Sequence, residues 1–222
     1  MRKYSVLLLI VFLLPIIINA QNKLPNDVRW VVESSEYKIL CNQIYNNAWN
    51  NLEHTLKSET EKWAIVMDLD ETVLDNSKYQ ITLVEKGENY NPESWSKWVN
   101  LKQAGLVPGA KTFINRIRTI EKYQIIFVSN RMHSNLEPTI DNMKELGIYG
   151  PNDIFLLRTN KQDKKPVRRN EILTGTERMK RHGAFKVLAF LGDASGDFPK
   201  EDSILSFSKG MYMFPNPMYG KW

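Results

Sequence analysis

Apolar and polar side chains follow each other along this chain in two recurring patterns. Residues 28–56 carry apolar side chains at helical spacing and predict one or two amphipathic helices. Further along, short and almost wholly apolar runs are bounded by polar residues and predict buried strands. These runs lie at residues 63–67, 123–130, 153–157 and 186–193.

Helical patterns separate the predicted strands. Asn91 followed by Pro92 is typical of a helix start, because asparagine caps a first turn and proline fits its first position. Apolar positions also recur at helical spacing around 113–120, near 136–147 and from about Pro166. This alternation predicts an α/β fold, with a Rossmann-like parallel sheet that carries helices on both faces.

The mature chain is predicted to be one domain. No repeat, low-complexity tract or linker divides residues 21–222, of which residues 21–60 form a helical N-terminal part. A short insertion follows the first predicted strand. We expect it to lie over the carboxyl ends of the strands, where ligands bind in such sheets.

Residues 1–20 have the pattern of a secretory signal peptide. Arg2 and Lys3 precede an apolar run at 5–18, and the segment ends in the small residue Ala20. A membrane anchor is the alternative, but this run is shorter than the roughly 20 residues that a spanning helix needs. We therefore expect cleavage near Ala20, an exported protein that is periplasmic or secreted, and no stable membrane anchor.

Charge and cysteine content narrow the classes of function. The chain has 30 Lys and Arg against 25 Asp and Glu, and its basic residues are scattered among acidic ones. That distribution is not typical of a protein that binds a nucleic acid polymer. Cys41 is the single cysteine, so disulfides do not hold an exported chain of this sequence together.

The segment VMDLDETVLDNS, residues 66–77, places carboxylates directly after the first predicted strand. Asp68 and Asp70 are two positions apart, so their side chains point the same way on an extended backbone. Like charges this close repel each other unless a cation lies between them. An isolated Asp-x-Asp pair is usually a turn or a helix cap, so its meaning depends on what the other strand ends contribute.

Polar side chains also follow two other predicted strands. Ser129, Asn130 and Arg131 end the second strand, and Asp193 and Asp197 follow the last long one. Carboxyl ends of parallel strands meet at one edge of a sheet, so up to four aspartates would converge there. Carboxylate oxygens are hard ligands, and this number of them suggests Mg²⁺.

The same edge offers what phosphoryl transfer needs. Ser129 supplies a hydroxyl, and the segment KQDKKPVRR at 161–169 supplies basic side chains. Transfer of a phosphoryl group depends mostly on positioning and charge neutralisation, which a metal ion, a lysine and a hydroxyl provide. One carboxylate can act as the nucleophile, and a second can protonate the leaving oxygen and then activate water.

Four short motifs, DLDET, VSNR, a downstream lysine and GDASGD, resemble those of the haloacid dehalogenase superfamily of phosphohydrolases. Longer segments, among them RWVVESSEYKIL, NPESWSKWV and FPNPMYGKW, resemble the bacterial class C acid phosphatases. The best-known type of that family, the outer-membrane lipoprotein e, is a 5'-nucleotidase. The resemblance extends from Arg29 to Trp222. It implies a magnesium-dependent acid phosphatase that hydrolyses phosphomonoesters, with 5'-nucleotides as expected substrates, through an aspartyl phosphate.

The resemblance also implies a role for each catalytic motif residue. Asp68 matches the nucleophile, which also binds the metal, and Asp70 matches the general acid/base, whose backbone carbonyl binds it. Thr72 closes the first motif with its hydroxyl. Ser129 matches the phosphate-binding hydroxyl, and Lys165 matches the lysine that neutralises the nucleophile and the phosphoryl group.

Two assignments concern the metal and the lysine. Asp193 and Asp197 match the carboxylates of the fourth motif, which bind or support the metal. Lys161 and Lys164 compete with Lys165 for the lysine role, although Lys165 directly precedes a proline and keeps the family's distance to the following arginine pair.

Four further residues are expected to bind the substrate. Asn130 and Arg131 belong to the second motif, and Asn130 stands where many relatives have Asp. Trp95 and Tyr219 match a pair of aromatic residues that clasp the nucleotide base, although both could instead be core residues. Ala194 stands where many relatives have Asn, which leaves the details of the phosphate pocket open.

Two alternative functions stay open on sequence grounds. One is a broad-specificity phosphomonoesterase without nucleotide preference, and the other is a non-catalytic binding protein on the same scaffold. The presence of Asp68 argues against the second. The lipid-accepting cysteine of the lipoprotein type is missing, which agrees with the absence of an anchor. A small phosphomonoester is the expected partner, and a homodimer is left open.

Overall fold

The computed structural model describes residues 23–58, 63–120, 123–200 and 210–220. The predicted signal peptide, residues 1–20, lies outside the described residues. Within these described ranges, no helix combines the length and the apolar character that a membrane span requires.

Five parallel strands form the central sheet in the order β5-β4-β1-β6-β7. Their bounds are β1 (Trp63–Met67), β4 (Tyr123–Met132), β5 (Ile154–Arg158), β6 (Lys186–Gly192) and β7 (Met211–Met213). The central strand β1 is buried along its whole length. Burial on both faces explains why its sequence is a continuous apolar run and not an alternating one.

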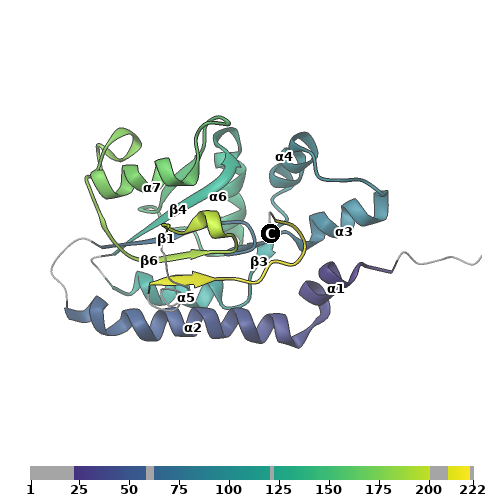
Figure 1. Cartoon of the computed structure of the whole chain (residues 1–222), viewed down its shortest axis with the longest axis horizontal. Helices are drawn as coiled ribbons and strands as arrows, with labels where there is room; N and C mark the ends of the chain where they lie inside the picture. Colours follow the sequence, from purple (N-terminus) through teal and green to yellow (C-terminus); the bar gives the residue numbers. More distant parts are fainter. Residues whose placement is uncertain (1–22, 59–62, 121–122, 201–209, 221–222) are drawn as a thin grey trace, which may run out of the picture.

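Helices cover both faces of this sheet (Figure 1). The helices of the described residues are α1 (Asn26–Glu33), α2 (Ser35–Ser58), α3 (Ser77–Lys86), α4 (Pro92–Leu101), α5 (Ala110–Arg118), α6 (Leu136–Glu145) and α7 (Lys165–Thr174). Of these, α3 and α4 belong to an insertion and lie at one end of the sheet. Ile65 and Met67 of β1 pack in one core cluster with residues of α2 and α5, whereas Ala64 and Val66 pack in another with α7. Alternate residues of β1 therefore pack into the cores on opposite faces of the sheet. The predicted α/β fold class is confirmed.

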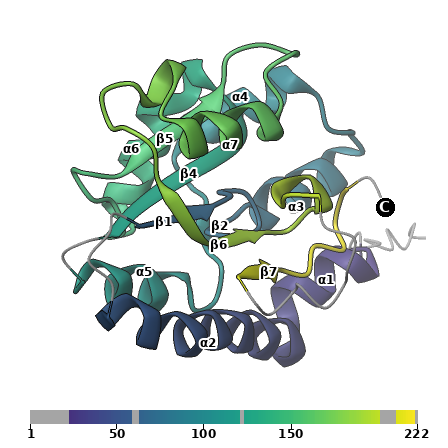
Figure 2. The ribbon, with the colours of Figure 1, turned by 60° about the vertical axis from the view of Figure 1, so that its left-hand side comes forward.

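The N-terminal part consists of two helices, as the sequence allowed. Its longer helix, α2, runs along α5 and reaches the edge strand β7 (Figures 1 and 2). Tyr45 of α2 is buried, and its hydroxyl donates a hydrogen bond to the carbonyl of Thr72 at 2.5 Å. Its ring packs against Phe113 and Phe214, with centroid distances of 5.1 and 4.6 Å. This helix therefore shares one core with the central sheet.

The insertion after β1 stands at one end of the sheet (Figure 1). Its base is a small antiparallel pair, β2 (Leu74–Asp75) and β3 (Gly105–Leu106), and its body consists of α3 and α4. The predicted start of α4 is confirmed, because the Asn91 side chain accepts a hydrogen bond from the Ser94 N–H at 2.8 Å. The body of the insertion packs on its own aromatic residues, with the rings of Tyr79 and Trp95 5.2 Å apart.

Candidate active site

Two carboxylates follow β1 at the carboxyl end of the sheet. The N–H of Asp68 donates to the carbonyl of Leu191 at 2.9 Å, so the backbone is still held by β6 at this point. Asp70 then begins a tight turn in which Glu71 has a left-handed φ of 54°. The N–H of Glu71 donates to the carbonyl of Leu74 at 2.8 Å and closes that turn. The turn sends the chain into the insertion and leaves both aspartates at the sheet edge.

Lys165, at the start of α7, joins two buried carboxylates. Its Nζ donates to Oδ1 of Asp68 at 2.5 Å and also to Oδ1 of Asp197. Burial acts to lower the pKa of Lys165, but the two carboxylates outweigh it, and the pKa of this ammonium group is raised. Lys161 and Lys164 are exposed, so the structure places Lys165, and neither competitor, among the carboxylates.

Asp68, Asp193 and Asp197 form a compact carboxylate cluster. One oxygen from each lies within 4.8 Å of the others. Burial together with the charge of Asp197 raises the pKa of Asp193 to about 6, and burial raises the pKa of Asp68 well above its usual range. Three hard oxygen donors that repel one another in this way suit a divalent cation of the Mg²⁺ type. Asn216, which the sequence interpretation missed, donates to Oδ2 of Asp193 at 2.8 Å.

Asp70 directs its side chain to other partners. Its Oδ1 accepts hydrogen bonds from Nε and Nη2 of Arg131, at 2.9 and 2.8 Å, and from Nδ2 of Asn76 at 3.0 Å. Its Oδ2 lies 3.4 Å from Oγ of Ser129. Arg131, expected from the sequence to bind substrate, thus forms an ion pair with Asp70 and is only 1% exposed.

The end of β4 is held by α7. Ser129 is fully buried, and its Oγ accepts a hydrogen bond from the Arg131 N–H at 3.1 Å. Nη1 of Arg168 donates to the carbonyl of Ser129, and Nη2 donates to Oδ1 of Asn130 at 2.7 Å. Sequence reasoning did not single out Arg168, although it belongs to the basic segment after β5. One helix therefore supplies both the lysine and the support of the hydroxyl-bearing strand end.

Two buried polar atoms of the first turn have no hydrogen-bond partner among the described residues. They are Oγ1 of Thr72 and Oε2 of Glu71. The other Glu71 oxygen accepts a hydrogen bond from the Asn76 N–H at 2.9 Å, and burial raises the pKa of this carboxyl well above its usual range. Unpartnered polar atoms beside clustered carboxylates are what a site built around a charged group would show.

The two aromatic residues predicted to bind a base occupy different segments. Trp95 of α4 is half-buried, and the guanidinium of Arg131 lies 5.7 Å from its ring centroid. Tyr219 is half-buried in the segment after β7 that also carries Asn216. Trp95 is thus linked to Asp70 through Arg131, and Tyr219 lies three residues after Asn216, which contacts Asp193.

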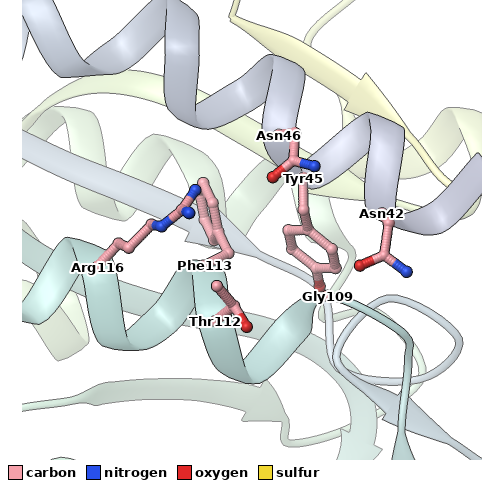
Figure 3. Close-up of a pocket in the computed structure, with 7 residues that line it drawn as sticks. All are labelled: Asn42, Tyr45, Asn46, Gly109, Thr112, Phe113 and Arg116. Carbon is pink, nitrogen blue, oxygen red and sulfur yellow. The ribbon is translucent and has the colours of Figure 1, made fainter.

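A small pocket between α2 and α5 contains none of the candidate residues (Figure 3). Tyr45 and Phe113 at its floor are core residues, and Arg116 at its rim lies over the ring of Trp49 at 5.7 Å. This pocket is a gap in the packing of α2 against α5. The candidate catalytic residues lie elsewhere, at the carboxyl end of the sheet.

Comparison with known proteins agrees with this geometry. Residues 16–222 match the family described as HAD superfamily, subfamily IIIB (Acid phosphatase). Two solved structures of the class C acid phosphatase from Bacillus anthracis, one of them a crystal structure with tungstate bound, are similar to this chain at 31% and 30% identity. Each comparison has a TM-score of 0.74, and the matched region covers 87% of this chain and 84% of the Bacillus anthracis chain. The chain therefore belongs to the acid phosphatases of haloacid dehalogenase subfamily IIIB and is a phosphomonoester hydrolase.

Proposed function

We propose that this protein is an exported, magnesium-dependent acid phosphatase that hydrolyses 5'-nucleotides through an aspartyl phosphate on Asp68. One observation carries the proposal. Asp68 is buried at the end of the central strand, is held by Lys165, and shares a carboxylate cluster with Asp193 and Asp197. A nucleophile, a neutralising ammonium group and cation ligands thus lie at one point.

The cation would be held by the carboxylates of Asp68, Asp193 and Asp197 and by the backbone carbonyl of Asp70. The donor set fits Mg²⁺, since the cluster offers only hard oxygen atoms. When bound, the ion neutralises negative charge on the phosphoryl oxygens. The hydrogen bond from Asn216 supports this role, because partners of ligating carboxylates fix their orientation.

The residues of the chain then divide the reaction between them. A carboxylate oxygen of Asp68 attacks phosphorus, the bond from phosphorus to the ester oxygen breaks, and Asp70 protonates that leaving oxygen. In the second half, Asp70 takes a proton from water, whose oxygen attacks phosphorus and displaces the Asp68 carboxylate. The products are an alcohol and inorganic phosphate. Lys165 neutralises the nucleophile and the phosphoryl oxygens throughout, as its position beside Asp68 supports.

The phosphate pocket is proposed to use three further groups. Ser129 Oγ and the Asn130 side chain would bind phosphoryl oxygens, since both lie at the end of β4 and are fixed there by Arg168. Thr72 would contribute its hydroxyl, which is buried and has no partner in the described part of the chain.

Two aspartate variants test the mechanism when compared at saturating Mg²⁺. Asp68→Asn should lower turnover of phosphomonoesters by on the order of 10⁴-fold or more, because the nucleophile is lost. Asp193→Asn should act mainly by weakening the affinity for Mg²⁺, so added metal should restore much of its activity. The wild type should lose activity in a chelator and regain it with Mg²⁺. Near-normal turnover of Asp68→Asn under these conditions would show that the covalent mechanism is wrong.

Nucleotide preference is tested separately with the two aromatic residues. Stacking on a base is worth roughly 1–3 kcal/mol, which corresponds to about 5- to 150-fold in kcat/KM. Trp95→Ala and Tyr219→Ala should therefore weaken hydrolysis of a 5'-nucleotide selectively and spare glycerol phosphate. Trp49→Ala is the matched control, because Trp49 is also half-buried and has an arginine 5.7 Å from its ring centroid. An unchanged ratio between the two substrates would favour a broad-specificity phosphomonoesterase.

We propose export on the N-terminal pattern alone, with the mature chain beginning near Gln21. Intact mass of the protein recovered from the periplasm or the medium measures this directly. The expected mass lacks residues 1–20, and an uncleaved chain in the membrane fraction would contradict the proposal.

A further inference from the structure

We propose that Arg131 is a positioning residue that holds the general acid/base Asp70 and the ring of Trp95 on one buried guanidinium, and that it does not bind substrate itself. The inference rests on the roles proposed above for Asp70 and Trp95.

The guanidinium of Arg131 is committed to the protein. Nε and Nη2 donate to Asp70, Nη1 donates to Oγ1 of Thr139 at 3.0 Å, and Nη2 also donates to Oδ1 of Asn76 at 3.3 Å. These bonds use four of the five N–H donors that an arginine has. With a side chain that is only 1% exposed, Arg131 has no N–H edge to present to a phosphate.

The same contacts give the two carboxylate oxygens of Asp70 different hydrogen-bond partners. Oδ1 accepts three N–H donors, two from Arg131 and one from Asn76. Oδ2 accepts none of these and faces the hydroxyl of Ser129 at 3.4 Å. Because charge-assisted hydrogen bonds resist rotation of the carboxyl, the guanidinium fixes Oδ2 toward the phosphate-binding side of the site.

Helix α4 is attached to this guanidinium at several points. The Trp95 ring lies over it at 5.7 Å, within the range of a cation–π contact. Nε1 of Trp98 donates at 2.9 Å to Asn76, the residue that also contacts both Arg131 and Asp70.

A third attachment runs through the segment that follows β4. Oγ of Ser96 donates to Oδ1 of Asn135 at 2.9 Å, and the carbonyl of Asn135 accepts a hydrogen bond from Thr139 at 2.7 Å. Thr139 in turn accepts from Arg131. Asp70 and helix α4, which carries Trp95, are therefore both held by Arg131. A substitution of Arg131 should disturb both of them.

Arg131→Lys tests this role, because lysine keeps the charge and loses the planar fork. Three substrates separate the effects at saturating Mg²⁺: acetyl phosphate, glycerol phosphate and a 5'-nucleotide. Acetate leaves without a proton, whereas an alkoxide needs one from Asp70. We expect kcat/KM for glycerol phosphate to fall by about 10²-fold, with a much smaller fall for acetyl phosphate. The nucleotide should lose more than glycerol phosphate, because the support of Trp95 is disturbed as well.

Arg118→Lys is the matched control, since Arg118 also pairs with a buried carboxylate, Asp153, at 2.5 Å and contacts no site residue named above. It should lower the melting temperature and leave the ratios among the three substrates unchanged. If Arg131→Lys does not fold, Thr139→Val removes one acceptor of the guanidinium and should shift the ratios in the same direction by less.

Equal losses of Arg131→Lys on all three substrates, with unchanged ratios, would overturn the proposal. A raised KM for all three at unchanged kcat would overturn it too, and would make Arg131 a direct phosphate ligand. Failure of the proposed nucleotide preference gives a different result. The wild type would then hydrolyse the nucleotide no better than glycerol phosphate, while the ratio of acetyl to glycerol phosphate would still test Arg131.

Discussion

Gly192 ends β6 at a point where a side chain would displace a site carboxylate. A Cβ at this position would lie 2.4 Å from Oδ2 of Asp197, far inside van der Waals contact. Because glycine leaves this space free, the Asp197 carboxylate folds back against the strand, where it accepts the Ala194 N–H at 3.0 Å and the ammonium of Lys165. The absence of one methyl group thus determines where the carboxylate of Asp197, a proposed cation ligand, lies.

Gly192→Ala should therefore impair the site without removing any functional group. The carboxylate of Asp197 would be pushed away from Lys165, and a misplacement of about 1 Å costs about 10²-fold in kcat/KM. Steady-state kinetics and Mg²⁺ titration measure the loss. Gly196→Ala is the control from the same loop, since a Cβ there has open space around it. Equal activity of the two variants would contradict this account.

At the scale of elements, the start of α7 depends on a buried ion network around Asp163. Its Oδ2 accepts hydrogen bonds from Arg178 and from the Thr159 N–H, each at 2.9 Å, and its Oδ1 lies 3.2 Å from Nε of Arg168. Although burial acts to raise it, the hydrogen bonds from Arg178 and Thr159 hold the pKa of Asp163 below its usual value. This network closes the loop between β5 and α7, directly before Lys165.

Asp163→Ala should destabilise the fold and lower activity together. It leaves two arginines without their shared carboxylate, and breaking a buried pair costs about 3–5 kcal/mol. Chemical denaturation measures the free energy of unfolding. Asp141→Ala is the control, because its pair with Lys102 is exposed and such pairs contribute about 0–1 kcal/mol. Similar stability of the two variants would show that the network does not support α7.

The longer elements could be predicted from the sequence because burial on both faces leaves a continuous apolar run. The predicted strand at 123–130 extends to Met132, and the helix expected from about Pro166 begins at Lys165. α3 was missed because only part of its polar sequence is buried, and β7 was missed because its three residues form a strand only by pairing with β6. Short elements of this kind are determined by partners that lie far away in sequence.

The candidate site also contains features that could be predicted from the sequence and features that could not. Motif residues such as Asp68, Lys165 and Asp193 could be predicted, because their chemistry is visible in the residue types and their order. The contacts of Arg131 could not, since its partner Asp70 precedes it by 61 residues and nothing in the local sequence indicates that pairing. The open alternative of a non-catalytic binding protein is wrong, because the chain belongs to a family of hydrolases.

At the scale of the whole molecule, a proton and a metal ion should compete for the same carboxylate, so that each stabilises the fold over a different range of pH. Burial raises the pKa of Asp193 to about 6, so the folded metal-free protein holds this proton more tightly than the unfolded chain does. The stability of the metal-free protein should therefore decrease as pH rises from the usual carboxyl range through about 6. A cation needs the deprotonated carboxylate, so stabilisation by Mg²⁺ should increase over the same interval.

Thermal denaturation with Mg²⁺ and with a chelator, at about one pH unit above and below that value, measures both trends. The rise in melting temperature caused by Mg²⁺ should be larger at the higher pH. In Asp193→Asn this dependence should be much weaker. A rise of equal size at both pH values in the wild type would mean that Asp193 does not titrate in competition with the metal.

The hydrogen bond from Asn216 to Asp193 and the packing of Phe214 on Tyr45 have a consequence for the timing of activity. The ribosome delivers Asp68 before β6, β7 and Asn216, which follow it by more than a hundred residues. A nascent chain therefore holds the proposed nucleophile without the proposed cation ligands beside it, because the pairing of β1 with β6 must wait for residues more than a hundred positions later. We therefore expect the proposed catalytic site to form only after β6 and β7 have joined the sheet, so an unfinished chain that lacks them should not hydrolyse phosphomonoesters.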